Sequence, residues 1–238
     1  MRLLRAGTRA QAGAAASAQA EADAASARVV HQAASWCLAY PDEDLVERLP
    51  LLTAAVDELP AGRARDGLRA FLDHASATPL DELERTYVHV FDLSRHQSLY
   101  LSYWTDGDTR RRGEVLAAFK ERYRASGFLV DTRGELPDHL PLVLEYAAVA
   151  DPVDGPALLQ EYRASLELIR FALLEHDSPY AGVLEAVCAT LPGASPADKA
   201  AVHAMAAAGP PRESVGLDAS DPRLLPLNET PHPVGGPS

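Results

Sequence analysis

Two segments of the chain combine residue types that suit chemistry or the binding of a partner. The first runs from Tyr87 to Gly113 and reads YVHVFDLSRHQSLYLSYWTDGDTRRRG. It holds several aromatic residues within 18 positions of a chain that is only 6% aromatic, namely Tyr87, Phe91, Tyr100, Tyr103 and Trp104. Rigid aromatic side chains are favoured anchors of protein and peptide interfaces. Either these rings line a groove for a partner, or they cap the core beneath a long connection.

The second segment, Glu135-Leu136-Pro137-Asp138-His139-Leu140-Pro141, places an acid and a histidine between two prolines at the start of a predicted helix. Asp138 suits the N-cap of that helix, and Pro141 is tolerated in its first turn. In this interpretation, His139 pairs with a nearby acid. In the alternative, a histidine that titrates beside carboxylates tunes the binding of a basic peptide with pH.

The sequence patterns of the common enzyme classes are missing from the chain. There is no phosphate-binding loop, no glycine-rich dinucleotide turn, no His-Glu-x-x-His and no Gly-x-Ser-x-Gly. Asp106-Gly107-Asp108 begins like a calcium-binding loop, but Ala117 stands where the bidentate glutamate is needed. The eight histidines do not have the spacing of metal ligands. We therefore expect no catalytic residue, no metal and no cofactor.

Charge and cysteine content limit the partners and the compartment. The chain has 34 acidic and 22 basic side chains, a formal net charge of −12, which would repel a nucleic-acid backbone. The acidic surface suits a basic peptide, or it serves solubility alone. The two cysteines, Cys37 and Cys188, are far apart in the sequence, which is typical of reduced thiols in a cytosolic protein. No apolar run approaches the roughly 18 residues of a membrane span. We predict a cytoplasmic protein with no nucleic-acid partner and no direct membrane insertion.

Helices must position both segments, because apolar residues recur with helical spacing through most of the chain. Such stripes cover residues 29–40, 45–59, 68–75, 80–91, 115–123, 140–147 and 158–173, with shorter helices expected near 180–190 and 196–207. The stripe over 158–173 predicts the clearest long helix, and Pro50 is expected to bend or restart the second. Strand signals are nearly missing, and no repeat has a fixed period. The sequence therefore predicts an all-α protein with a single irregular helical bundle.

The two ends of the chain differ from the part between them. Residues 1–24 are low in complexity and have no large apolar residue after Leu4, which predicts a disordered extension that partly joins the first helix. Residues 209–238 hold seven of the 18 prolines and several glycines, which predicts a second disordered tail. The helical domain is expected to cover residues 25–208.

At the two unusual segments the sequence resembles the NarJ family, the molybdenum-cofactor assembly chaperones of respiratory nitrate reductase, within the wider TorD-like group. The resemblance covers about residues 29–192 and depends on ASWCLAYP at 34–41, the aromatic segment at 87–113 and ELPDHLPLVLEYAA at 135–148. It implies a helical, TorD-like chaperone that binds the N-terminal segment of the apo catalytic (alpha) subunit of a molybdenum-dependent nitrate reductase. The chaperone would hold that subunit competent for cofactor insertion and delay its docking to the membrane, without being an enzyme.

The resemblance also implies which residues line or support the groove for the client peptide. By matching motif positions, these are Tyr87, Phe91, Tyr100, Tyr103, Asp106, Glu135, Pro137, Asp138, His139 and Glu145. Two other classes of function stay open from the residues themselves. One is a helical regulator whose aromatic segment encloses a small ligand, and the other is a helical hydrolase that uses Asp138, His139 and Glu145.

Overall fold

The computed structural model describes residues 6–93, 97–106, 110–128, 131–132 and 134–208. Within these ranges the chain is helical, and its one β feature is an isolated antiparallel bridge between Tyr100 and His139. The prediction of an all-α bundle is confirmed. The predicted tail over 209–238 lies outside the described residues.

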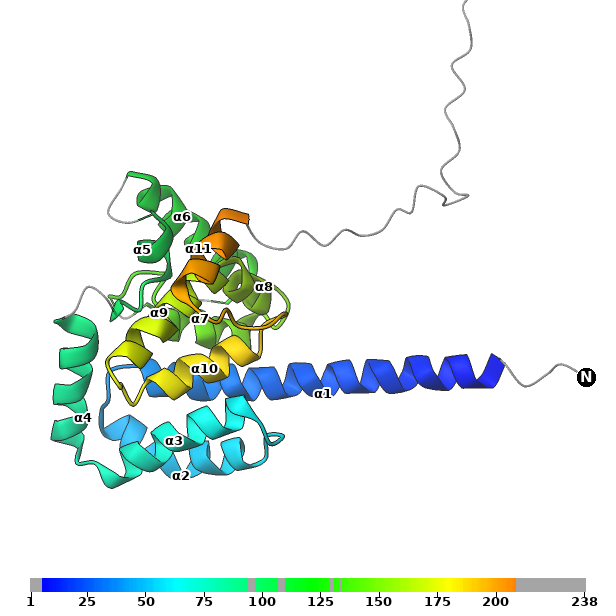
Figure 1. The fold of residues 1–238 in the computed structure, drawn as a ribbon, viewed down its shortest axis with the longest axis horizontal. Helices are drawn as coiled ribbons and strands as arrows, with labels where there is room; N and C mark the ends of the chain where they lie inside the picture. Colours follow the sequence, from blue (N-terminus) through cyan, green and yellow to red (C-terminus); the bar gives the residue numbers. More distant parts are fainter. Residues whose placement is uncertain (1–5, 94–96, 107–109, 129–130, 133, 209–238) are drawn as a thin grey trace, which may run out of the picture.

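Eleven α-helices and two π-helical turns make up the described part of the fold (Figure 1). In chain order they are α1 (Ala6–Leu38), α2 (Glu43–Asp57), α3 (Arg63–Ala77), α4 (Leu80–Tyr87), the π-turn η1 (Val88–Asp92), α5 (Leu101–Asp106), α6 (Arg110–Ala125), α7 (Leu140–Glu145), the π-turn η3 (Tyr146–Ala150), α8 (Asp154–Glu161), α9 (Arg163–Glu175), α10 (Ala181–Ala189) and α11 (Lys199–Ala208).

The first helix is longer than the sequence predicted. Residues 1–24 were expected to form a disordered extension that partly joins the first helix, and the part that joins α1 covers residues 6–24. Alanine, the best helix former, dominates this stretch and explains its helical state. The side chains of residues 15–25 are exposed, and Figure 1 shows this half of α1 projecting out of the body. Only the end of α1 contributes to the core, through residues such as Ala34 and Cys37.

The core lies where α1, α3, α9 and α10 meet. The apolar stripe predicted on α3 is buried as expected, with Leu68, Phe71, Leu72 and Ala75 inside. Gly67, directly before this stripe on α3, faces Gly182 of α10, and the two glycines allow the backbones of these helices to touch. A Cβ atom added to Gly67 would lie only 2.2 Å from the carbonyl oxygen of Gly182.

Two predicted helices differ from the structure. Of the bend or restart expected at Pro50, the restart does not occur, because α2 runs through Pro50 from an N-cap at Asp42, whose carboxylate accepts from Leu45 N at 2.9 Å. The long helix predicted over 158–173 is broken at Tyr162, where the backbone leaves helical geometry and α9 begins anew. Apolar periodicity continues across this break, so that the stripe alone does not reveal it.

A buried charged cluster fixes the connection between α10 and α11. The carboxylate of Glu167, which is fully buried, pairs with Arg170 at 2.7 Å and with Arg163 at 3.4 Å. The two guanidinium groups also donate to backbone carbonyls of the connection, at Pro192, Gly193 and Pro196. Pairing and hydrogen bonding are what allow such charges to be buried, although Nε of Arg163 has no partner among the described residues.

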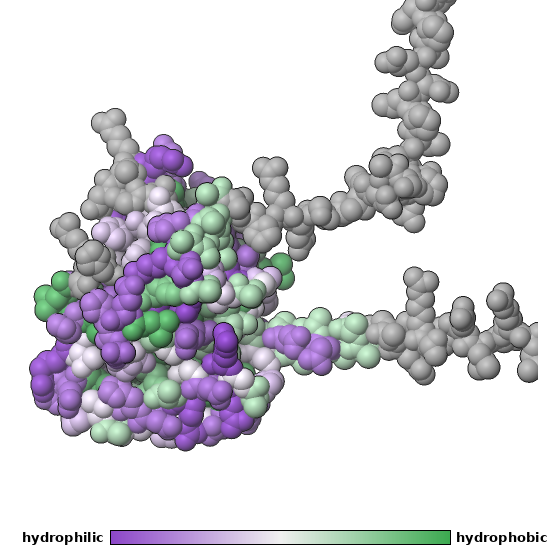
Figure 2. Space-filling view, viewed as in Figure 1, coloured by the Kyte–Doolittle hydropathy of each residue, from purple (hydrophilic) through white to green (hydrophobic). Residues whose placement is uncertain are grey.

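The surface is mainly hydrophilic on the face drawn in Figure 2, where hydrophobic residues appear only in small patches between polar ones. None of the described helices combines the length and the apolarity that a membrane crossing requires.

Candidate functional site: an apolar hollow with an acidic rim

The aromatic segment begins on α4 and continues through the π-turn η1. The wider turn ends the helix with a bond from Leu93 N to the carbonyl of Val88 at 3.0 Å, and it leaves the Leu93 side chain 74% exposed. Short π-helical turns of this kind are frequent at functional sites.

Tyr87 and Phe91, two of the predicted groove residues, lie in the core beneath this surface. The Tyr87 ring is 4.8 Å from Phe91 and 5.4 Å from the half-exposed Tyr40, and its hydroxyl donates to the carbonyl of Leu38 at 3.2 Å. Phe91 packs 4.9 Å from Tyr180. Both side chains are more than nine-tenths buried, so that they support the surface and do not line it.

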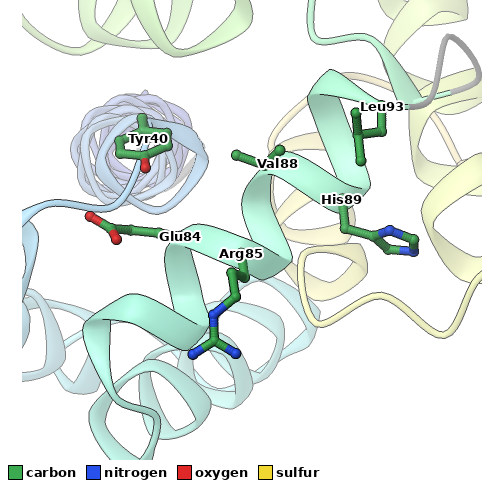
Figure 3. Close-up of a pocket in the computed structure, with 6 residues that line it drawn as sticks. All are labelled: Tyr40, Glu84, Arg85, Val88, His89 and Leu93. Atoms are coloured by element: carbon green, nitrogen blue, oxygen red, sulfur yellow. The ribbon is translucent and has the colours of Figure 1, made fainter.

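Above them lies an open hollow of about 470 Å³, lined by Tyr40, Glu84, Arg85, Val88, His89 and Leu93. Figure 3 shows Glu84 and Val88 projecting toward Tyr40, whereas Arg85 and His89 project from other sides of the same helical stretch. Tyr40 and Leu93 are large apolar side chains left in contact with water, which makes this hollow a candidate place for a partner.

The second predicted segment is joined to the aromatic one by backbone hydrogen bonds. Leu101 N donates to the carbonyl of Asp138 at 3.1 Å, and Leu140 N donates to that of Leu99 at 2.8 Å. The resulting bridge places the Tyr100 and His139 rings 5.2 Å apart. The Tyr100 hydroxyl also donates to Glu135 at 2.5 Å.

Asp138 does not cap the helix that follows it, which corrects the sequence prediction. His139 occupies the N-cap position of α7 and makes no capping bond through its side chain. The Asp138 side chain is fully buried, and its Oδ2 accepts from the backbone N of Ser102 at 3.0 Å and from the Ser102 hydroxyl at 2.6 Å. The Asp138 carboxylate is therefore bonded to the first turn of α5 and not to α7.

Acidic groups from both segments shift the pKa values of the same two side chains, His139 and Tyr87. Burial lowers the pKa of His139 below its usual range, and the charges of Glu135, Asp138 and Asp92 oppose that effect. Burial also raises the pKa of the Tyr87 phenol, and the charges of Asp92 and Glu135 add to the increase. The charges of Asp92 at the end of η1 and of Glu135 before α7 thus both act on Tyr87 and His139, although 43 positions separate the two acids in the sequence.

The remaining predicted residues are divided between this site and other places. Pro137 is buried, and its carbonyl accepts from the Tyr123 hydroxyl at 2.6 Å. Tyr103 is half-buried, with its ring centroid 6.0 Å from the Arg112 guanidinium. Glu145 is exposed on α7, and no contact joins it to the other predicted residues. Asp106 is the last residue of α5, and its side chain lies outside what the structure describes.

Sequence reasoning missed the residues that line the hollow. Tyr40 belongs to the apolar stripe over 29–40, and stripes predict burial, whereas Leu93 follows the stripe over 80–91 and was not singled out. A usable signal was the position of Tyr40 directly before Pro41, where the helix must end and its last apolar side chain can stay outside the core.

The described fold is an all-helical bundle that carries an open hollow beside the exposed side chains of Tyr40 and Leu93. Among the described residues, no group of three or more His, Cys, Asp or Glu side chains is placed to hold a metal ion.

The chain belongs to the nitrate reductase delta subunit family, whose sequence model matches residues 57–186. It is 33% identical over 164 residues to the probable nitrate reductase molybdenum cofactor assembly chaperone NarJ of Bacillus subtilis, covering 69% of this chain and 89% of that protein. It is 32% identical over 168 residues to the chaperone NarJ of Escherichia coli, covering 69% and 70% of the two chains. The predicted family is thereby confirmed.

Two further similarities concern length and fold. The nitrate reductase-like protein NarX of Mycobacterium tuberculosis is 43% identical over 163 residues, but the match spans 24% of NarX, about a quarter of its length. The crystal structure of a putative redox enzyme maturation protein from Archaeoglobus fulgidus aligns with a TM-score of 0.51 at 22% identity, covering 68% of this chain and 91% of that one. This second likeness supports the fold alone.

Proposed function

We propose that the protein is a cytoplasmic chaperone for the assembly of a molybdenum-dependent respiratory nitrate reductase, and that it binds but does not catalyse. It binds the N-terminal segment of the apo catalytic (alpha) subunit, holds that subunit competent for insertion of the molybdenum cofactor, and delays its docking to the membrane. The chaperones NarJ of Bacillus subtilis and Escherichia coli, by their names, serve nitrate reductase in this general way, which supports the proposal.

The observation that carries the proposal is the open hollow, to which Tyr40, Val88 and Leu93 offer apolar contact and Glu84 a carboxylate. We assign Asp92 and Glu135 to an acidic rim of this hollow, because the charges of both act on Tyr87 beneath it. A client segment that forms an amphipathic helix would bury apolar side chains in such a hollow and present basic ones to the rim. The net charge of −12 favours the approach of a basic segment over longer distances.

The expected affinity is moderate. Each buried apolar anchor contributes about 1.5–3 kcal/mol, and ordering of a flexible client segment opposes binding by several kcal/mol. The balance corresponds to dissociation constants from about micromolar to high nanomolar, weak enough for release of the matured enzyme.

Calorimetric titration with a peptide of the catalytic subunit's N-terminal residues tests the proposal. Leu93→Ser should weaken binding about tenfold, because it removes an exposed apolar contact, which corresponds to about 1.4 kcal/mol. Leu51→Ser is the matched control: Leu51 is 69% exposed but lies on α2, away from the hollow. Both variants should melt close to the wild type.

Three results would count against the proposal in different ways. Equal affinity of the wild type and Leu93→Ser would place the peptide elsewhere on the molecule. An equal loss in Leu51→Ser would mean that the peptide binds apolar surface without selectivity. No binding by the wild type would remove the proposed function itself.

A further inference from the structure

Asp138 is a buried carboxylate with an unequal set of hydrogen bonds. Its exposed fraction is 0%, and both donors to Oδ2 come from one residue, Ser102, which is also 0% exposed. The other oxygen, Oδ1, is buried and has no hydrogen-bond partner among the described residues. Burial of a charge is costly unless hydrogen bonds compensate it, so that the contact with Ser102 must supply most of the compensation.

The two bonds reach the first turn of α5, 36 positions earlier in the chain. Ser102 is the second residue of α5, where backbone N–H groups lack partners within the helix. A carboxylate at this end satisfies such an N–H group and interacts favourably with the helix dipole. Since α5 has only six residues, it cannot be stable by itself in water and depends on contacts of this kind.

The start of α5 is bonded, through Leu101 N and the carbonyl of Asp138, to the segment before α7. This segment carries Glu135, which belongs to the proposed client site. This register stacks Tyr100 on His139 and brings the Tyr100 hydroxyl to Glu135. If α5 shifted or unwound, these three groups would lose their arrangement, although none of them contacts the Asp138 carboxylate through a hydrogen bond.

We propose that Asp138 and Ser102 form a positioning pair, which sets the client-binding surface by capping α5 and does not touch the client. The proposal assumes the function given above and adds to it the residues that hold the surface in place. It differs from the interpretation in which a buried aspartate at this position meets the client directly, because Ser102 then has no part in binding.

Peptide titrations of the full chain with single and double variants separate the two interpretations. Ser102→Ala removes a hydroxyl that is fully buried, and it should weaken peptide binding about three- to tenfold. Asp138→Ala should weaken peptide binding at least as much. The double variant should bind the peptide as well as Asp138→Ala does, because the effects of two residues that act through one contact are not additive. Asp138→Asn should retain most of the affinity, since its amide oxygen still accepts both bonds.

Hydrogen exchange gives a readout that does not depend on the client. In Ser102→Ala the amides of α5 should exchange faster, whereas those of α3 and α10 should exchange as in the wild type. Ser165→Ala serves as the control, because Ser165 is also 0% exposed but its hydroxyl has no hydrogen-bond partner among the described residues. It should change neither the exchange of α5 nor the peptide affinity.

Each result decides the proposal. Unchanged affinity in Ser102→Ala together with a loss in Asp138→Ala would mean that Asp138 meets the client, which overturns it. Unchanged exchange of α5 in Ser102→Ala would show that the pair does not hold the helix, which also overturns it. If the wild type binds no peptide, the proposed function fails, and the exchange rates of α5 then decide the capping role alone.

Discussion

Two regions of the molecule are held together by different forces. Around α3 and α10 the contacts are apolar and close, with Leu68, Leu72, Val183 and Leu184 fully buried and with glycine facing glycine. In the described parts of residues 97–139, directional hydrogen bonds add to the apolar packing of residues such as Leu101 and Phe119. There the Tyr123 hydroxyl donates to the carbonyl of Pro137 at 2.6 Å, and the indole of Trp104 donates to that of Ser98 at 2.9 Å.

The two kinds of contact contribute differently to stability and to geometry. Apolar packing scales with buried area and supplies most of the stability of a bundle. A hydrogen bond contributes only about 1 kcal/mol net, but it fixes direction, which a binding surface requires. We therefore expect changes in the packed region to affect folding, and changes in the hydrogen-bonded region to affect the client more than the fold.

The largest effect is expected where the packed region has no room. Gly67→Ala should destabilise the protein by at least about 3 kcal/mol, because the new Cβ would meet backbone atoms of Gly182 that cannot move independently. Gly113→Ala is the matched control: it lies inside α6 with no atom within 4 Å, and it should raise stability by up to about 1 kcal/mol. Urea unfolding of both variants measures the effect, and a Gly67→Ala protein as stable as the wild type would contradict the close packing.

His31, which is buried on α1, makes the stability of the protein depend on pH. Its Nε2 lies 2.9 Å from the hydroxyl of Thr190, and burial lowers its pKa to about 4 from 6.5. Because the unfolded chain binds this proton more readily, the contribution is complete above pH 6.5 and is lost as the pH falls toward 4. The loss should reach about 2 kcal/mol at pH 5 and about 3 kcal/mol at pH 4.

Comparison with His31→Gln isolates this contribution, since His139 also has a lowered pKa and acts in the same direction. The free energy of unfolding, measured by urea between pH 7.5 and 4, should fall less steeply in the variant. Parallel curves would show that His31 keeps its ordinary pKa in the folded protein.

The packed region was predictable from the sequence because periodic apolar residues report burial directly. All four residues of the stripe on α3 are inside, as predicted. The contact of Gly67 with Gly182 was not predictable, since a glycine carries no sign of which helix will approach it. The break at Tyr162 was missed for a similar reason, because the apolar pattern continues through a change in backbone direction.

The hydrogen-bonded region was predictable in its composition but not in its connections. The sequence singled out Asp138 and Tyr100, and the structure brings their two segments together. The sequence analysis assigned Asp138 to the N-cap of the helix that follows, because capping patterns are local. The actual partner of Asp138, Ser102, lies 36 positions earlier in the chain. The exposed Tyr40 was assigned to a stripe that predicts burial, since periodicity does not distinguish the last apolar residue of a stripe from a buried one, and Leu93 was not singled out.

The smallest effect on the fold is expected at the rim of the site. Glu135 is exposed, so that Glu135→Gln should change the free energy of unfolding by no more than about 0.5 kcal/mol, although it weakens the bond from the Tyr100 hydroxyl. Its effect on the client should be kinetic, because a charge at the edge of an interface mainly steers association. Stopped-flow association with the client peptide should become two- to fivefold slower at low salt, a change on the order of 0.5–1 kcal/mol. The difference from the wild type should shrink as salt screens the charge.

Glu47→Gln, at an exposed position of α2 away from the hollow, removes the same charge and should leave the rate nearly unchanged. If both variants slow association equally, the net charge of the whole protein steers the client and the rim has no special part. If neither does, the acidic balance serves solubility, and the apolar hollow alone must select the client.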